Sequence, residues 1–170
     1  MKNFLKIVNK IRDIIEIYVP MAAFLTMFLT FILQIIMRRV FNNPLTWAYE
    51  VTVIGFIWTV ILGACYAQRY RAHVKFTLIY DMLSKEKAAI VRALGNLIIV
   101  VAFILLIVPS YKYVTFMSFQ STSVFKIKLS WIFMPFVYFL ISISLYTIEE
   151  IVEDYKILRD YRRQLKESKI

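Results

Sequence analysis

The stretch IYVPMAAFLTMFLTFILQIIM, residues 17–37, runs for 21 residues without one charged side chain. Three more charge-free stretches follow it, at residues 51–68, 93–111 and 129–148. An α-helix rises about 1.5 Å per residue, so about 20 residues cross a hydrocarbon core about 30 Å thick. The sequence therefore predicts an all-α integral membrane protein in which residues 1–170 form a single domain of four transmembrane helices.

The composition agrees with this fold class. Hydrophobic residues make up 61% of the chain, whereas soluble domains contain about 45–50%. The apolar runs are continuous, while the strands of a membrane β-barrel alternate apolar and polar residues over about ten positions. We expect the first run to be kept as an anchor, because the apolar region of an export signal has only about 7–15 residues.

The positive residues predict the orientation in the membrane. Sixteen of the 21 Lys and Arg residues lie before residue 17, between residues 69 and 92, or after residue 148, and five lie in the other two connections. Because Lys and Arg concentrate on the cytoplasmic side, both termini should be cytoplasmic. The net charge of +10 then serves contacts with anionic lipid headgroups. We expect no nucleic acid binding, since no soluble segment is long enough to fold a basic face.

Three segments outside the spans mix apolar and charged residues. Residues 4–15 place apolar side chains at helical spacing opposite lysines, which is typical of an amphipathic helix at the membrane surface. The tail after residue 148 fits either a second interfacial helix or a solvated continuation of the fourth spanning helix. We expect residues 73–91 to lie along the inner interface.

The charge-free runs hold no acid or base, although proton and ion pathways need ionisable groups inside the membrane. Glu16, at the edge of the first run, could serve a small exporter, but the neighbouring Arg12 and Asp13 predict a carboxylate solvated among headgroups. His73 is the only histidine and Cys65 the only cysteine, too few to ligate haem, zinc or an iron–sulfur cluster. We predict no cofactor, no metal site and no enzymatic activity, with Cys65 as a small packing residue.

The first two spanning helices carry two patterned faces. Every fourth position of the second helix holds a small residue, which lets helix backbones approach closely, and this ridge consists of Gly55, Thr59, Gly63 and Ala67. The first helix carries an aromatic stripe, which consists of Phe24, Phe28 and Phe31. This stripe could fill the bundle, face lipid or form a docking surface for a partner, and the sequence leaves all three open.

The connection RRVFNNPLTWAYEV, residues 38–51, suits a tight turn between the first two spanning helices. Asn43 could cap the second helix, and Pro44 could occupy its first position, where no amide hydrogen is needed. Trp47 would lie at the membrane interface. Glu50 would lie in the positive first turn of the helix, where Arg38 could form an ion pair with it and fix the hairpin.

This connection and WTVILGACYAQRYRAHV, residues 58–74, resemble the DctQ-like small membrane subunit of tripartite ATP-independent periplasmic (TRAP) transporters. The family pattern has an arginine before F-N-x-P, then a tryptophan, an acid, a second tryptophan, L-G-A, and an alanine–histidine–hydrophobic triplet. The matching residues are Arg38, Phe41, Asn42, Pro44, Trp47, Glu50, Trp58, Leu62, Gly63, Ala64, Ala72, His73 and Val74. Trp131 and Pro135 resemble the start of the family's fourth helix, whereas Tyr49 replaces a second acid that many members carry.

The resemblance implies a small, non-transporting scaffold in the bacterial inner membrane. In this family a large membrane subunit carries sodium ions and substrate, and a periplasmic substrate-binding protein delivers a carboxylate-bearing organic acid. The expected partners are therefore the large subunit, the binding protein and membrane lipids. The turn at residues 38–50 is the expected contact for the binding protein.

Two other classes of function remain alternatives. A self-sufficient small multidrug-type exporter would work as a homo-oligomer around Glu16 and would confer drug resistance when expressed alone. A bundle subunit of a respiratory complex would bind haem or quinone, which the single histidine disfavours.

Overall fold

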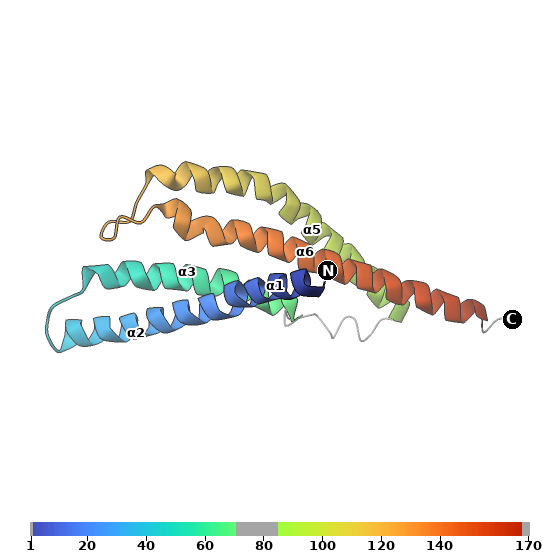
Figure 1. The fold of residues 1–170 in the computed structure, drawn as a ribbon, viewed down its shortest axis with the longest axis horizontal. Coiled ribbons are helices and arrows are strands. Elements are labelled where there is room, and N and C mark those ends of the chain that lie inside the picture. Colours follow the sequence, from blue (N-terminus) through green and yellow to red (C-terminus); the bar gives the residue numbers. More distant parts are fainter. Residues whose placement is uncertain (1, 71–84, 168–170) are drawn as a thin grey trace.

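In the computed structural model, which describes residues 2–70 and 85–167, nearly all of the chain is helical (Figure 1). Within those residues, four helical stretches are long and apolar enough to cross a membrane: Lys6–Arg39, Thr46–Arg69, Ile90–Phe119 and Leu129–Lys156. The predicted all-α fold with four spanning helices is confirmed. The elements in chain order are α1 (Lys2–Asp13), η1 (Ile14–Tyr18), α2 (Val19–Arg39), α3 (Thr46–Arg69), α5 (Lys85–Phe116), η2 (Met117–Phe119) and α6 (Leu129–Glu167).

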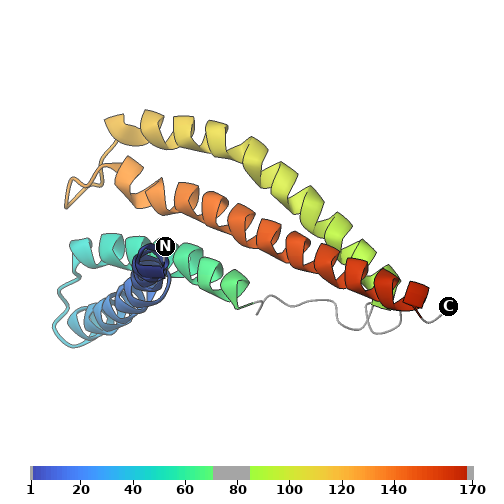
Figure 2. The same ribbon diagram turned by 45° about the vertical axis from the view of Figure 1, so that its right-hand side comes forward.

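The spanning helices pack as a row rather than as a closed bundle. α2 packs on α3, α3 on α6, and α6 on α5, so α2 and α5 lie at opposite ends of the row (Figure 2). In the most apolar window of α6, 44% of residues are buried, against 6% in α5. The outer helices therefore direct most of their apolar surface away from the protein, toward lipid or other membrane helices.

The α2–α3 turn and the connection from η2 to α6 lie side by side at one end of this row (Figure 1). The C-terminus lies at the other end, and the N-terminus lies between the two ends. The helices form two hairpins, α2 with α3 and α5 with α6. The core between these hairpins includes Leu62 and Cys65 of α3, with Leu140 and Ile143 of α6, all at most 5% exposed.

Pro20 explains the wide turn that joins α1 to α2. Residues 14–18 form a π-helical turn, closed by the Val19 amide, which donates to the Ile14 carbonyl. Proline has no amide hydrogen, and its ring crowds the carbonyl four residues earlier, here that of Glu16. A wider turn relieves this crowding without ending the helix. Residues 4–15, expected as an interfacial helix, are thus continuous with the first spanning helix.

The tail continues the fourth spanning helix, since α6 extends unbroken to Glu167. Of the two interpretations of the tail, the structure shows the continuation. The expected interfacial segment at residues 73–91 lies largely outside the described residues, and its described part, from Lys85 onward, belongs to α5.

Candidate functional site

The connection between α2 and α3 is a tight turn, but α3 begins later than predicted. Asn42 has a left-handed φ of 49°, which asparagine tolerates better than most residues. The Asn43 amide donates a hydrogen bond to the Met37 carbonyl at 3.0 Å. α3 begins at Thr46 without a side-chain cap. Asn43 and Pro44 therefore precede the helix, and the capping and first-position roles predicted for them are wrong.

Glu50 contacts the second hairpin rather than Arg38. Its Oε1 accepts a hydrogen bond from the Val124 amide at 2.6 Å, and its Oε2 accepts one from the Phe125 amide at 3.1 Å. Glu50 is 8% exposed, whereas Arg38 is exposed, and among the described residues no ion pair joins them. The predicted pair is wrong because the Glu50 carboxylate is directed at the η2–α6 connection.

That connection, residues 120–128, is called the clamped loop below. It folds back on itself, with the Thr122 amide donating to the Ile127 carbonyl at 2.9 Å and the Leu129 amide donating to the Gln120 carbonyl at 3.0 Å. Lys126 has a left-handed φ of 56°. Successive amides that point at one carboxylate form an anion-binding concavity. Glu50 thus fixes the tip of the clamped loop against α3.

A second polar cluster lies where the continuous helix formed by α1, η1 and α2 meets α3 and α6. Glu16 is 1% exposed. Its Oε1 accepts hydrogen bonds from the Tyr138 hydroxyl at 2.9 Å and the Tyr146 hydroxyl at 2.5 Å. Arg69, the last residue of α3, places Nη1 3.7 Å from Glu16 Oε2. The expectation of a carboxylate solvated among headgroups is wrong, because side chains of two other helices enclose it.

Two further side chains complete this group, called the Glu16 cluster below. Arg69 Nη1 donates to Asp13 Oδ1 at 2.6 Å. Arg12 Nε donates to the Tyr146 hydroxyl at 2.9 Å, and its guanidinium lies 4.4 Å from the centre of the Tyr146 ring. Buried charges are tolerated when each has a partner of opposite charge or a hydrogen bond. The Glu16 cluster therefore joins the first hairpin to the second at the end opposite the clamped loop.

α5 and α6 have polar contacts of their own toward the chain termini. Arg92 Nε donates to Asp154 Oδ2 at 2.7 Å, and Asn96 Nδ2 donates to Glu150 Oε2 at 3.2 Å. Both acids are buried. These contacts fix the second hairpin where its helices extend past their apolar runs.

The ridge of small residues approaches α2 closely over part of its length. A Cβ at Gly55 would lie 2.9 Å from Met27 Cβ of α2. The Thr59 hydroxyl, which donates to the Gly55 carbonyl at 2.7 Å, lies 3.4 Å from the Pro20 carbonyl. A Cβ at Gly63 would meet no atom of the described residues within 4 Å. Close approach is therefore found in the half of the ridge nearer the α2–α3 turn.

The other residues singled out from the sequence do not gather at one point. The Trp58 indole donates to the Ile132 carbonyl at 3.2 Å, one turn before Pro135 in α6. His73 lies outside the described residues. The phenylalanines of the aromatic stripe are each about half exposed, so they do not fill the row. Trp47 and Ala67 are half-buried, and Phe41 and Trp131 are exposed, as are Asn42, Asn43 and Pro44 of the turn.

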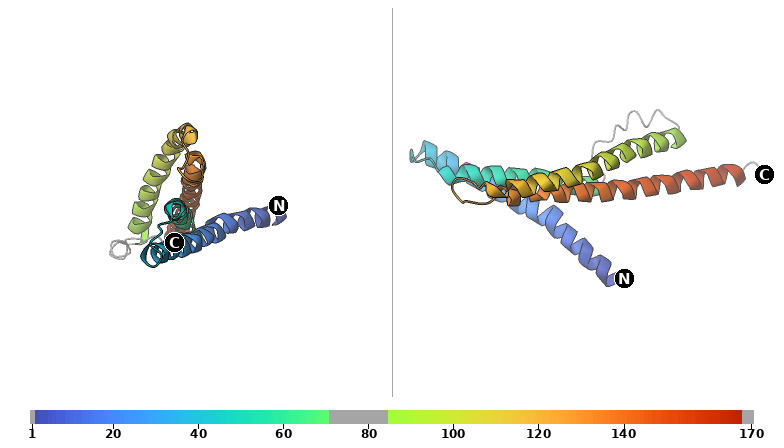
Figure 3. Two further views of the ribbon diagram at one scale, coloured as in Figure 1. Left: turned by 90° about the vertical axis from the view of Figure 1, so that its left-hand side faces the viewer. Right: turned by 90° about the horizontal axis from the view of Figure 1, so that it is seen from above.

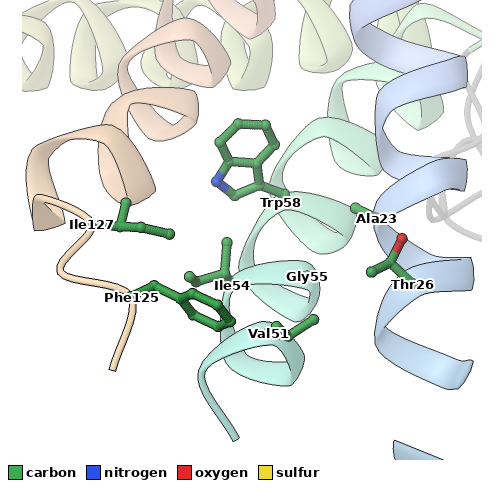
Figure 4. A pocket seen from close by; sticks show the side chains of 8 residues that line it. All are labelled: Ala23, Thr26, Val51, Ile54, Gly55, Trp58, Phe125 and Ile127. Atoms are coloured by element: carbon green, nitrogen blue, oxygen red, sulfur yellow. The ribbon is translucent and has the colours of Figure 1, made fainter. Parts of the chain in front are cut away.

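An open hollow of about 340 Å³ lies between α2, α3 and the clamped loop (Figure 4). Trp58 lies over its centre, with Phe125 on the loop side and Thr26 on the α2 side. Of the side chains that the structure describes, no charged one lines it. The hollow therefore fits apolar groups and gives no path for a carboxylate. Among the described residues, no group of three or more His, Cys, Asp or Glu side chains could hold a metal ion.

Sequence reasoning missed the partners of both glutamates. Tyr138 and Tyr146 are eight residues apart and so share a face of α6. Asp13 and Glu16 are three residues apart, which places both on one side of the helix formed by α1, η1 and α2. These spacings were a readable signal for polar faces, but they did not show which faces meet.

Comparisons with known proteins show which family this chain resembles. Residues 27–156 match the family described as tripartite ATP-independent periplasmic transporters, DctQ component. The chain is 30% identical over 132 residues to the sialic acid TRAP transporter small permease protein SiaQ of Vibrio cholerae, covering 77% of this chain and 73% of SiaQ. It is 36% identical over 84 residues to the C4-dicarboxylate TRAP transporter small permease protein DctQ of Vibrio cholerae, covering 47% of this chain and 34% of DctQ.

A longer relative matches as well. The sialic acid TRAP transporter permease protein SiaT of Haemophilus influenzae is 25% identical over 129 residues, which cover 76% of this chain. The matched region spans 20% of SiaT.

Proposed function

The chain belongs to the DctQ component family of TRAP transporters, and on that premise we propose that it is a non-transporting scaffold for a large membrane subunit. As a small permease subunit in the membrane, it is a transport component and not an enzyme. In the proposal it supports sodium-coupled, binding-protein-dependent uptake of organic acids across the inner membrane, with both termini cytoplasmic. The names of its relatives, for sialic acid and C4-dicarboxylates, support carboxylate-bearing solutes as the class.

The observation that carries the proposal is the open row of helices. A solute path for an organic acid needs polar or charged groups along it, and the hollow beside Trp58 has no charged lining. The buried carboxylates already have partners: two tyrosine hydroxyls donate to Glu16 Oε1, Arg69 Nη1 lies 3.7 Å from Glu16 Oε2, and two backbone amides donate to Glu50. Polar contacts at both ends of the row fix the two hairpins relative to each other. A rigid row with wide apolar faces suits support of a neighbour that moves.

The match to SiaT supports a division of labour between polypeptides. SiaT is named as a permease protein, and this chain corresponds to 20% of its length. We infer that the remainder of such a permease corresponds to the large subunit on which this chain docks. The four helices then act as one domain, laterally attached to a larger transporter.

Uptake in proteoliposomes tests the proposal. Large subunit, binding protein and this chain are reconstituted with a sodium gradient, and uptake of a carboxylate solute is compared with co-purification of the two membrane subunits. Glu50→Ala releases the clamped loop and should lower uptake and co-purification together. Arg38→Gln is the matched control in the same turn and should leave co-purification of the two membrane subunits unchanged, since Arg38 does not pair with Glu50. Uptake by this chain alone, or loss of uptake with assembly and binding-protein engagement intact, contradicts the scaffold role.

The exporter alternative makes a different structural demand. A working glutamate must open to a solute path, whereas Glu16 is 1% exposed and hydrogen-bonded to two tyrosines. Drug resistance conferred by this chain expressed alone would favour that alternative over the scaffold.

A further inference from the structure

α1 diverges from α6 toward the amino terminus and leaves a wedge-shaped space between the two helices (Figure 3). The proposed scaffold role assigns no function to this wedge. At the base of the wedge is a hollow of about 240 Å³ whose polar lining includes Arg12, Ser142, Tyr146 and Glu149. The hollow lies beside the Glu16 cluster, so two of its lining side chains, Arg12 and Tyr146, are held in place by hydrogen bonds of that cluster.

Arg12 is held in this hollow in one orientation. Its Nε donates to the Tyr146 hydroxyl at 2.9 Å, and the guanidinium stacks over the Tyr146 ring at 4.4 Å. The adjacent acid, Asp13, is engaged by Arg69 at 2.6 Å. Among the described residues, no acceptor contacts the two terminal nitrogens of Arg12. An oriented guanidinium with free terminal nitrogens is suited to two parallel hydrogen bonds with a phosphate.

The depth of Arg12 matches that of lipid headgroups. Arg12 precedes the charge-free run at residues 17–37 by five residues, which is about 8 Å along a helix axis. The rest of the hollow is apolar, formed by Val8, Ile141 and Leu145. A phosphate near Arg12 would therefore have hydrocarbon beside it, which fits a phospholipid better than a free phosphate ion.

Glu149 indicates the class of headgroup. It lines the same hollow and, among the described residues, forms no ion pair with Arg12. A headgroup that carries only negative charge would be repelled by this carboxylate. A headgroup with both a phosphate and a primary ammonium matches Arg12 and Glu149 together, through charge-assisted hydrogen bonds at each end.

We propose that the wedge between α1 and α6 binds one zwitterionic phospholipid of the ethanolamine type, with the phosphate on Arg12 and the ammonium on Glu149. The acyl chains lie along Ile141 and Leu145, on the apolar side of the hollow. The site belongs to this chain alone and does not depend on its role as a scaffold.

Native mass spectrometry of the full-length chain, extracted in mild detergent with any bound membrane protein left in place, tests the site. The delipidated protein is titrated with phosphatidylethanolamine, with phosphatidylglycerol, or with inorganic phosphate. One ethanolamine lipid should bind in preference to the glycerol lipid, and millimolar phosphate should not displace it. Displacement by phosphate would overturn the lipid assignment.

Two substitutions test the roles of the charged residues. Arg12→Gln should weaken ethanolamine-lipid binding about tenfold or more, because the phosphate loses its charged partner. Glu149→Gln should keep lipid binding but reverse the preference toward the glycerol lipid. An unchanged preference in Glu149→Gln would overturn the ammonium contact, and unchanged binding in Arg12→Gln would overturn the site.

Because Arg12 also contacts Tyr146, a second pair of variants leaves the Glu16 cluster untouched. Leu145→Trp fills the hollow from its apolar side and should abolish binding of the ethanolamine lipid. Ile148→Trp adds the same bulk to an exposed position of α6 outside the hollow and should not. Equal lipid binding by these two variants would overturn the proposal, whatever Arg12→Gln does to folding.

Discussion

The hydroxyl of Tyr146 offers the sharpest test of the Glu16 cluster. Tyr146 is 4% exposed. It donates to Glu16 Oε1 at 2.5 Å and accepts from Arg12 Nε at 2.9 Å. The conservative change Tyr146→Phe removes only the oxygen atom and leaves the ring that packs in the row. Any loss of stability therefore reports the hydrogen bonds and not a cavity.

The expected loss follows from these two contacts. A hydrogen bond to a charged group contributes about 1.5–3 kcal/mol to stability, so Tyr146→Phe should lower the free energy of unfolding by about that amount. For a chain of this size, 1 kcal/mol corresponds to about 2–4 °C in Tm, which gives a decrease of about 3–12 °C. Tyr138→Phe removes the other hydroxyl that donates to Glu16 Oε1, at 2.9 Å, and should also cost about 1.5–3 kcal/mol. Glu16→Ala leaves both hydroxyls without their acceptor and should cost about 3–5 kcal/mol.

Thermal unfolding in detergent micelles, followed by far-UV circular dichroism, measures these differences. Tyr155→Phe is the matched control, because Tyr155 is a tyrosine of the same helix that is 67% exposed. It should change stability by less than about 0.5 kcal/mol. The double variant Glu16→Gln with Tyr146→Phe should be less destabilised than the two single effects together, since the side chains share one hydrogen bond.

Equal Tm values for Tyr146→Phe, Glu16→Ala and Tyr155→Phe would refute this reasoning. That result would mean that Glu16 is solvated among headgroups, as its neighbours in the sequence suggest. The polar contacts that join the hairpins would then be those of Glu50 with the clamped loop and of Trp58 with the Ile132 carbonyl.

Three further predictions concern the rest of the row. Glu50→Gln replaces one acceptor oxygen with an amide, so the Phe125 amide should exchange its hydrogen faster, as measured by hydrogen–deuterium exchange; unchanged protection would contradict the clamp. Gly55→Ala should lower the free energy of unfolding by about 1–3 kcal/mol, because the new Cβ would lie 2.9 Å from an atom of α2. Gly63→Ala should be neutral or stabilising, since Ala favours a helix over Gly by about 1 kcal/mol. Similar Tm shifts for the two variants would exclude close packing at one end of the ridge. Asp154→Asn should lower the Tm by weakening the charged contact between α5 and α6, and an unchanged Tm would show that this contact adds no stability.

The lengths and number of the spanning helices could be predicted because they depend on local properties of the chain. An uncompensated charge in hydrocarbon costs several kcal/mol, so a run of about 20 uncharged residues specifies a span wherever it occurs. The turn at Asn42 was also local, since its positive φ suits that residue. The helix starts were less exact: α3 begins at Thr46, two residues after the first position predicted at Pro44, because the backbone of Leu45 is still extended.

The sequence by itself determined that this chain spans the membrane four times with helices, since the cost of charge in lipid acts residue by residue. The tertiary structure alone decided what Glu16 and Glu50 do. Their partners lie 122 and 130 residues away for Glu16 and 74 and 75 residues away for Glu50. Such pairings depend on which helices lie side by side in the row. Each buried carboxylate needs hydrogen-bond donors, and several different helix packings could have supplied them.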